Sequence, residues 1–324
     1  MRLLVALFTI TILVAAQSNE PLRLEKTIPL PGVQGRIDHM SIDVKNHRLF
    51  VAALGNNTVE VIDVKEGKRV KTIGGLKEPQ GVLYVAESDR LYVANGKDGS
   101  VCIFDGTSYA LLKTIDYGDD ADNLRYDSRR QRVYVGYGGG AVAAIDNQGN
   151  KGDEIKLDAH PESFQLAKDT SHIYVNLPGS HKVAVLDVDK HSVLAKWGTG
   201  MAFANYPMAF DEPDHRLFVV TRMPARLLVF DTESGKIIQS LPVVGDCDDV
   251  FYDKARKRIY ASGGEGAISV VDQKDADHYV DTERIATVKG ARTSFFSSDL
   301  DRLFLAVRRQ GSQPAAIKIF VPAS

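Results

Sequence analysis

Acidic and histidine side chains recur in short clusters, each just before a short apolar run, and they are the residues best suited to chemistry. The clusters are Asp38 with His39, Asp120 with Asp122 and Asn123, His160 with Glu162, and Asp246 with Asp248 and Asp249. Carboxylate oxygens are the ligands that Ca²⁺ and Mg²⁺ prefer, and an added imidazole allows Zn²⁺ or Mn²⁺. A histidine beside a carboxylate is also suited to proton transfer.

A repeated pair of β-strands has to position these clusters. In its clearest copy, β-rich runs at residues 91–94 and 101–104 flank a Gly/Asn/Asp turn, which predicts a hairpin. An Arg, once replaced by His, precedes the first run at intervals of 40 to 44 residues: Arg48, Arg90, Arg132, His172, Arg216, Arg258 and Arg302. A period of about 40 to 45 residues, with four strands per unit, is typical of propeller blades. The sequence therefore predicts an all-β fold, a seven-bladed β-propeller with four-stranded blades.

The ends of the repeats predict how the ring closes. We expect one propeller domain over residues 19–324, with blades that start near residues 36, 78, 120, 160, 204, 246 and 290. The last repeat stops at its third strand, whereas Lys-Thr-Ile at 26–28 copies the blade endings at 71–73 and 113–115. We predict that a strand at residues 22–28 completes blade 7, which leaves no open sheet edge between the first and last blades.

The N-terminal segment predicts the cellular location of the chain, and the net charge limits its binding partners. Residues 1–18 hold one Arg, an apolar run and a small-residue cleavage pattern, which predict a cleaved signal peptide and a periplasmic or secreted location. The run is too short for a membrane span, which needs about 20 residues, although an uncleaved anchor is the alternative. The net charge of −2 gives no basic field for nucleic acid or an anionic membrane. We expect a monomer.

The repeat register places a ring of side chains at one mouth of the central channel. The first strand of each blade lines that channel, and seven residues occupy equivalent positions where these strands begin: Asp38, Gln80, Asp122, Glu162, Tyr206, Asp248 and Arg292. The residues two and four positions later are mostly apolar. The register therefore predicts that polarity is concentrated at the mouth and is not spread along the strands.

This ring and its neighbours form the predicted ligand site. Its members are Arg36, Asp38, His39, Asp120, Asp122, Asn123, His160, Glu162, Asp246, Asp248, Asp249 and Arg292. Crowded carboxylates need compensation, which favours a bound cation. Asp122, Glu162 and Asp248 are the candidate ligands of a divalent ion (Ca, Mg, Zn or Mn), and His39 and His160 are the candidate catalytic residues.

Two further interpretations of the mouth stay open. Asp and Asn at the start of a strand also cap turns through the backbone, so part of the ring could be purely structural. Arg222, Arg308 and Arg309 fall in loops between second and third strands on the same side and are placed to hold an anionic part of a ligand.

Three repeat segments resemble a known family. Tyr-Val-Ala-Asn at 92–95, Tyr-Val-Asn at 174–176 and Phe-Val-Ala at 50–52 resemble the YVTN repeat of exported bacterial seven-bladed propellers similar to the YncE-like group, over about residues 22–321. The resemblance is specific for the fold but weak for function, since similar blades occur in binding proteins, lactonases and electron-transfer enzymes. It implies an exported binding protein that holds a small molecule or a partner's segment at the mouth. The alternatives are a divalent-metal-assisted hydrolase or lactonase that uses the same ring, and a protein-interaction scaffold.

Overall fold

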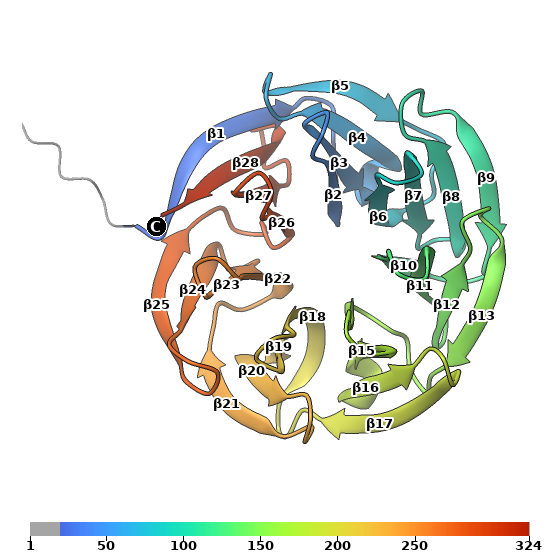
Figure 1. Cartoon of the computed structure of the whole chain (residues 1–324). Helices are drawn as coiled ribbons and strands as arrows, with labels where there is room; N and C mark the ends of the chain where they lie inside the picture. The colour runs from blue at the N-terminus through green and yellow to red at the C-terminus, as the bar shows by residue number, and fades with distance from the viewer. Residues whose placement is uncertain (1–19, 324) are drawn as a thin grey trace, which may run out of the picture.

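Seven antiparallel four-stranded sheets are arranged in a ring around a central channel (Figure 1). The computed structural model describes residues 20–323, so the predicted signal peptide lies outside the described residues. The innermost strands are β2 (Met40–Asp43), β6 (Pro79–Val85), β10 (Ala121–Asp127), β14 (Phe164–Leu166), β18 (Phe203–Asp211), β22 (Cys247–Asp253) and β26 (Ser294–Ser297). They begin blades 1 to 7, in this order.

The two middle strands of each blade form the core. The second strands are β3 (Arg48–Ala53), β7 (Arg90–Asn95), β11 (Arg132–Tyr137), β15 (His172–Leu177), β19 (Arg216–Met223), β23 (Arg258–Gly263) and β27 (Arg302–Val307). The third strands are β4 (Thr58–Asp63), β8 (Ser100–Asp105), β12 (Ala141–Ile145), β16 (Lys182–Asp187), β20 (Ala225–Asp231), β24 (Ala267–Gln273) and β28 (Ala315–Pro322). Successive residues of these strands are buried, because both faces of each sheet pack against neighbouring blades.

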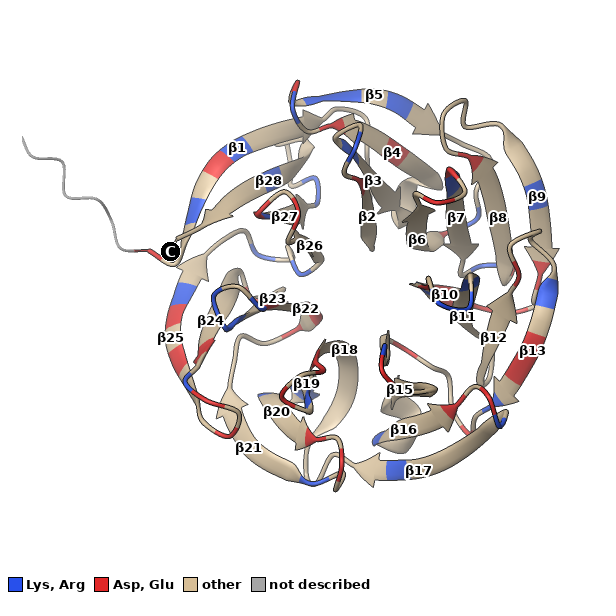
Figure 2. Ribbon diagram, in the orientation of Figure 1, with Lys and Arg blue, Asp and Glu red and all other residues tan. Residues whose placement is uncertain are grey.

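The outer strands have one solvated face, and they carry much of the surface charge (Figure 2). They are β5 (Lys68–Ile73), β9 (Leu111–Asp116), β13 (Lys151–Lys156), β17 (Ser192–Gly198), β21 (Ile237–Pro242), β25 (Tyr279–Ala286) and β1 (Leu22–Leu30). The strand β1 pairs with β28, so the first described strand completes the last blade. The predicted fold is confirmed, including this closure.

The arginine that marks the repeat connects neighbouring blades. The guanidinium of Arg48 donates to the hydroxyl of Tyr109 at 2.8 Å, and that of Arg90 donates to the carbonyl oxygen of Asn147 at 2.6 Å. Arg216 donates to the carbonyl oxygen of Ala276 at 2.9 Å. In each case the acceptor lies in the turn between the third and outer strands of the next blade. The conserved spacing of these arginines thus reflects blade-to-blade packing.

The helical segments among residues 20–323 are the short 3₁₀ turns η1 (Leu54–Asn56) and η2 (Pro178–Ser180). No helix in this part of the chain is long and apolar enough to cross a membrane.

Candidate functional site

Three of the loops that enter the innermost strands share one backbone feature. In three blades the residue directly before the innermost strand has a φ between 31° and 55°: Glu78, Asp120 and Asp246. Asp tolerates this left-handed region better than most residues. The carbonyl oxygens of Asp120 and Asp246 also accept the N–H groups of Gly138 and Gly264 at 3.0 and 2.9 Å. Asp120 and Asp246 therefore have a structural role in these loops.

The mouth brings together an acidic group from blades 3 and 4. Ligand atoms of Asp122, His160 and Glu162 all lie within 4.8 Å of one another, a spacing that suits a metal ion. The imidazole Nδ1 of His160 lies 2.7 Å from the carbonyl oxygen of Gly138. Because a carbonyl oxygen only accepts, Nδ1 carries the hydrogen, and the Nε2 lone pair is free in the neutral ring. Nε2 lies 3.8 Å from Asp120, which accepts a hydrogen bond from Gln80 at 2.8 Å.

Burial and repulsion between like charges raise the pKa values of the two carboxylates, Asp122 and Glu162. Burial, followed by the charge of Asp248, raises the pKa of Glu162 to about 7. Burial and the charge of Glu162 raise the pKa of Asp122 well above its ordinary value. Asp122 is 6% exposed, and its Oδ1 has no hydrogen-bond partner among residues 20–323. Neither carboxylate forms an ion pair with an arginine among residues 20–323, although the imidazole of His39 lies 3.8 Å from Asp122.

A second group at the mouth is dominated by arginines from blades 5 and 7. Asp248 forms ion pairs with Arg222 and with Arg292, the latter at 2.7 Å. Arg292 also pairs with Asp246 at 2.7 Å, and the guanidinium of Arg222 lies 4.0 Å from the centre of the Tyr206 ring. Of the three predicted metal ligands, Asp248 is thus bound by two arginines, and the side chains whose spacing suits a metal ion are Asp122, Glu162 and His160.

Arg308 is the unpaired cation of this arginine group. It is half-buried and forms no ion pair with any residue in the described range 20–323. Burial, together with the neighbouring Arg292 and Arg36, lowers its pKa. Arg36 itself pairs with the buried Asp38 at 2.6 Å.

His39 lies across the channel beneath the mouth. Its Nε2 lies 3.9 Å from Asp38 and 3.8 Å from Asp122, and its Nδ1 lies 3.5 Å from Asp249. These carboxylates come from blades 1, 3 and 6. Burial lowers the pKa of His39, but the carboxylates of Asp249, Asp38 and Asp122 outweigh burial and raise it to about 10. His39 is therefore a cation at neutral pH, which makes it a poor general base.

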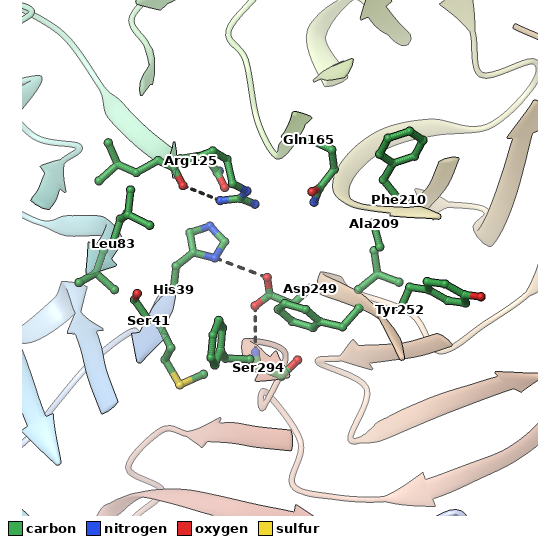
Figure 3. A pocket seen from close by; sticks show the side chains of 18 residues that line it. His39, Ser41, Leu83, Arg125, Gln165, Ala209, Phe210, Asp249, Tyr252 and Ser294 are labelled. Atoms are coloured by element: carbon green, nitrogen blue, oxygen red, sulfur yellow. Dashed lines mark hydrogen bonds and ion pairs between the residues drawn. The ribbon is translucent and has the colours of Figure 1, made fainter. Parts of the chain in front are cut away.

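The channel beyond His39 contains polar residues that the sequence analysis did not select. A cavity of about 310 Å³ is lined by Ser41, Arg125 and Gln165 as well as by His39 and Asn123 (Figure 3). These polar residues lie one and three positions after the mouth residue. The residues at positions two and four are mostly apolar and pack in the core between blades, and some of them, such as Phe210, also line the cavity. The expectation that polarity stops at the mouth was wrong, because it followed the positions of the wrong strand face.

The structure thus distributes the predicted ligand-binding residues over three neighbouring groups. Asp120, Asp122, His160 and Glu162 form the acidic group; Arg36, Asp38, Asp246, Asp248 and Arg292 belong to the arginine-compensated part; and His39, Asn123 and Asp249 lie at the cavity. Together these features define a seven-bladed β-propeller with a charged mouth and a polar channel.

Comparison of the sequence with known proteins identifies relatives that share the repeat region. No protein-family model matches the chain. The uncharacterized protein YncE of Salmonella typhi is 22% identical over 287 residues, which cover 84% of this chain and 69% of that protein. YncE of Salmonella typhimurium (strain LT2) is 25% identical over 219 residues, covering 62% and 61%. Antigen Lp49 of Leptospira interrogans is 22% identical over 237 residues, covering 68% and 51%. The matched part thus spans about half to two thirds of these relatives, and the chain is a seven-bladed β-propeller that is similar to YncE.

Solved structures share the fold at lower identity. A chain of the Kuenenia stuttgartiensis hydrazine synthase has a TM-score of 0.74 at 16% identity, covering 86% of this chain and 95% of that one. A chain of the mitotic checkpoint complex has a TM-score of 0.79 at 13% identity, covering 100% and 99%. These likenesses concern the fold alone.

Proposed function

We propose that the chain is an exported binding protein whose channel mouth holds a small zwitterionic ligand. The observation that carries this proposal is that, among the residues that the structure describes, the mouth has crowded carboxylates without an arginine partner on one side and an arginine without an ion pair on the other. Asp122 and Glu162 crowd one another on one side, and Arg308 has no ion pair among residues 20–323 on the other. The charge of Asp248 acts on both Glu162 and Arg308, which supports a single mouth shared by both halves.

A ligand with both charges would satisfy both halves at once. A buried carboxylate or guanidinium without a partner is costly, and a charge-assisted hydrogen bond recovers much of that cost. In this proposal the cationic group of the ligand faces Asp122 and Glu162, and its anionic group faces Arg308. The paired Arg222 and Arg292 hold Asp248 in place between the two halves.

Calorimetric titration of the full chain with the twenty common amino acids and glycine betaine tests this proposal. We expect at least one of these zwitterions to bind, and Glu162→Gln and Arg308→Gln each to weaken its binding at least about tenfold. Glu87→Gln is the matched control, because Glu87 is exposed in a turn on the opposite face. Failure of every probe to bind, or equal binding by both mouth variants, would contradict the proposal; the second result would favour the scaffold hypothesis.

A second candidate function, a divalent-metal-assisted hydrolase or lactonase, is favoured by the spacing of Asp122, His160 and Glu162. Imidazole nitrogen and carboxylate oxygen are both zinc ligands, and three protein ligands with a fourth position left open are the arrangement of catalytic Zn²⁺ sites. The hydrogen bond from His160 to Gly138 fixes the ring as outer partners of metal-binding histidines do. The unpartnered Oδ1 of the buried Asp122 also fits a metal ligand.

In such a hydrolase the three side chains would hold the ion, which would supply Lewis-acid polarisation of a carbonyl group. His160 would orient its Nε2 toward the ion while its Nδ1 donates to Gly138, so it would not serve as the proton-transfer residue. His39, already protonated, would stabilise negative charge near Asp122 and would not abstract a proton.

Zinc titration of the chelator-treated full chain tests the metal site directly. We expect one equivalent of Zn²⁺ to bind and His160→Ala to weaken binding at least about tenfold, because one of three ligands is lost. His278→Ala is the control, since His278 forms an exposed pair with Asp275 on the opposite face. Zinc that binds the His160 variant as tightly as the unaltered chain would remove this candidate. Hydrolysis of esters and lactones by the zinc-loaded chain would then separate an enzyme from a binding protein.

A further inference from the structure

A second chamber lies in the channel, on the side of His39 away from the mouth. It is the cavity of about 310 Å³ in Figure 3, and residues from all seven blades line it. Its wall near His39 is polar, whereas Leu83, Phe251 and Phe295 make another part of the wall apolar. The rings of Phe251 and Phe295 meet edge to face, with centroids 5.9 Å apart. The chamber therefore suits a molecule with one polar end.

Arg125 lines this chamber, and its guanidinium has no carboxylate partner among residues 20–323. Its guanidinium donates to the carbonyl oxygen of Leu124 at 2.8 Å and to the Ser163 hydroxyl at 3.4 Å. It forms no ion pair with any residue between 20 and 323, and burial lowers its pKa despite the charges of Asp249 and Asp122. A guanidinium carries five N–H donors, so several of them are left for a ligand.

The neighbouring polar groups do not neutralise Arg125. Asp249 is already engaged, because Oδ1 lies 3.5 Å from His39 Nδ1 and Oδ2 accepts the N–H of Ser294 at 2.9 Å. Asn123 is 2% exposed and lines the chamber; its Oδ1 has no hydrogen-bond partner among residues 20–323, and its Nδ2 donates no hydrogen bond to them. The free Nδ2 donor beside an unpaired guanidinium is an arrangement that a bound acceptor would complete.

We propose that this chamber binds an organic monocarboxylate with a small apolar body. The guanidinium of Arg125 receives the carboxylate through two parallel hydrogen bonds, and the amide of Asn123 donates a third. The apolar body packs against Phe251, Phe295 and Leu83, which a bare inorganic anion would leave uncovered. This site is separate from the mouth, so it does not depend on the function proposed above.

Calorimetric titration of the full chain with 3-phenylpropionate tests the site, with the neutral 3-phenylpropionamide as the matched probe. We expect the acid to bind at least tenfold more tightly than the amide. In Arg125→Gln this difference should disappear, because the charge that distinguishes the two probes is lost. Arg284→Gln, an exposed arginine on the outer strand β25, should bind the acid as the unaltered chain does.

Arg125→Lys keeps the test decisive if the glutamine variant does not fold. Lysine retains the charge but lacks the planar fork, so we expect it to bind the acid at least fivefold more weakly than arginine while still preferring the acid over the amide. Equal binding of acid and amide to the unaltered chain would overturn the proposal. Absence of binding at millimolar concentration, or inorganic phosphate binding as tightly as 3-phenylpropionate, would overturn it as well.

Discussion

Deletion of residues 22–28 is expected to lower the free energy of unfolding by about 5 kcal/mol or more. The deletion removes the fully buried side chains of Leu22 and Ile28 and most of the strand that pairs with β28. It also exposes the edge of β28, which then offers unpaired backbone groups to other chains. Urea denaturation followed by circular dichroism should show the loss, and light scattering should show association of the truncated chain.

Two point variants in the same strand separate packing from strand pairing. Ile28→Ala should cost about 2 to 4 kcal/mol because the side chain is 1% exposed, whereas Leu24→Ala, 45% exposed, should cost less than about 0.5 kcal/mol. Unchanged unfolding of the truncated chain would show that the N-terminal strand does not hold the ring closed.

The second large effect is expected at His39. His39→Gln leaves the carboxylates of Asp38, Asp122 and Asp249 around a neutral side chain. Removal of one partner from a buried charge cluster costs about 3 to 5 kcal/mol. We expect a loss of that order near pH 6, measured by urea denaturation.

The dependence of this loss on pH follows from the raised pKa of His39. Folding raises that pKa from its ordinary value of about 6.5 to about 10, so the folded chain binds the proton more tightly. The stabilisation is complete below pH 6.5 and is lost as the pH rises toward 10. The difference between His39→Gln and the unaltered chain should shrink over this window. His191→Gln, whose side chain is 49% exposed, is the control, and a difference that grows with pH would contradict this account.

The fold could be predicted because the repeat encodes it locally. Each copy supplies strands rich in Val, Ile and Tyr, a turn and an arginine, and the same interactions recur in blade after blade. Closure by β1 was also predictable, since Lys-Thr-Ile at 26–28 copies the ends of blades 1 and 2. The bounds of the mature domain and of the signal peptide remain predictions.

The site could be predicted only in part. The register identified which residues share the mouth, but it did not show which of them compensate one another. Asp248 and Glu162 occupy equivalent positions, yet Arg222 from the end of β19 in the neighbouring blade reaches Asp248, while Glu162 lies beside Asp122. Arg125 was missed because channel-facing residues follow the odd positions after the mouth residue. The same register, read at those positions, would have revealed it.

His39 couples the charged mouth to the cavity beneath it, because it interacts with a carboxylate of each. Its imidazole is shared between Asp122, which faces the mouth, and Asp249, which lines the lower cavity. A cation bound at the mouth would compete with His39 for Asp122 and thereby change the electrostatic potential beneath it. By thermodynamic reciprocity, an anion in the lower chamber would alter the affinity of the mouth by the same factor. A propeller channel with such a central imidazole would thus behave as a pair of cooperative sites and not as an open pore.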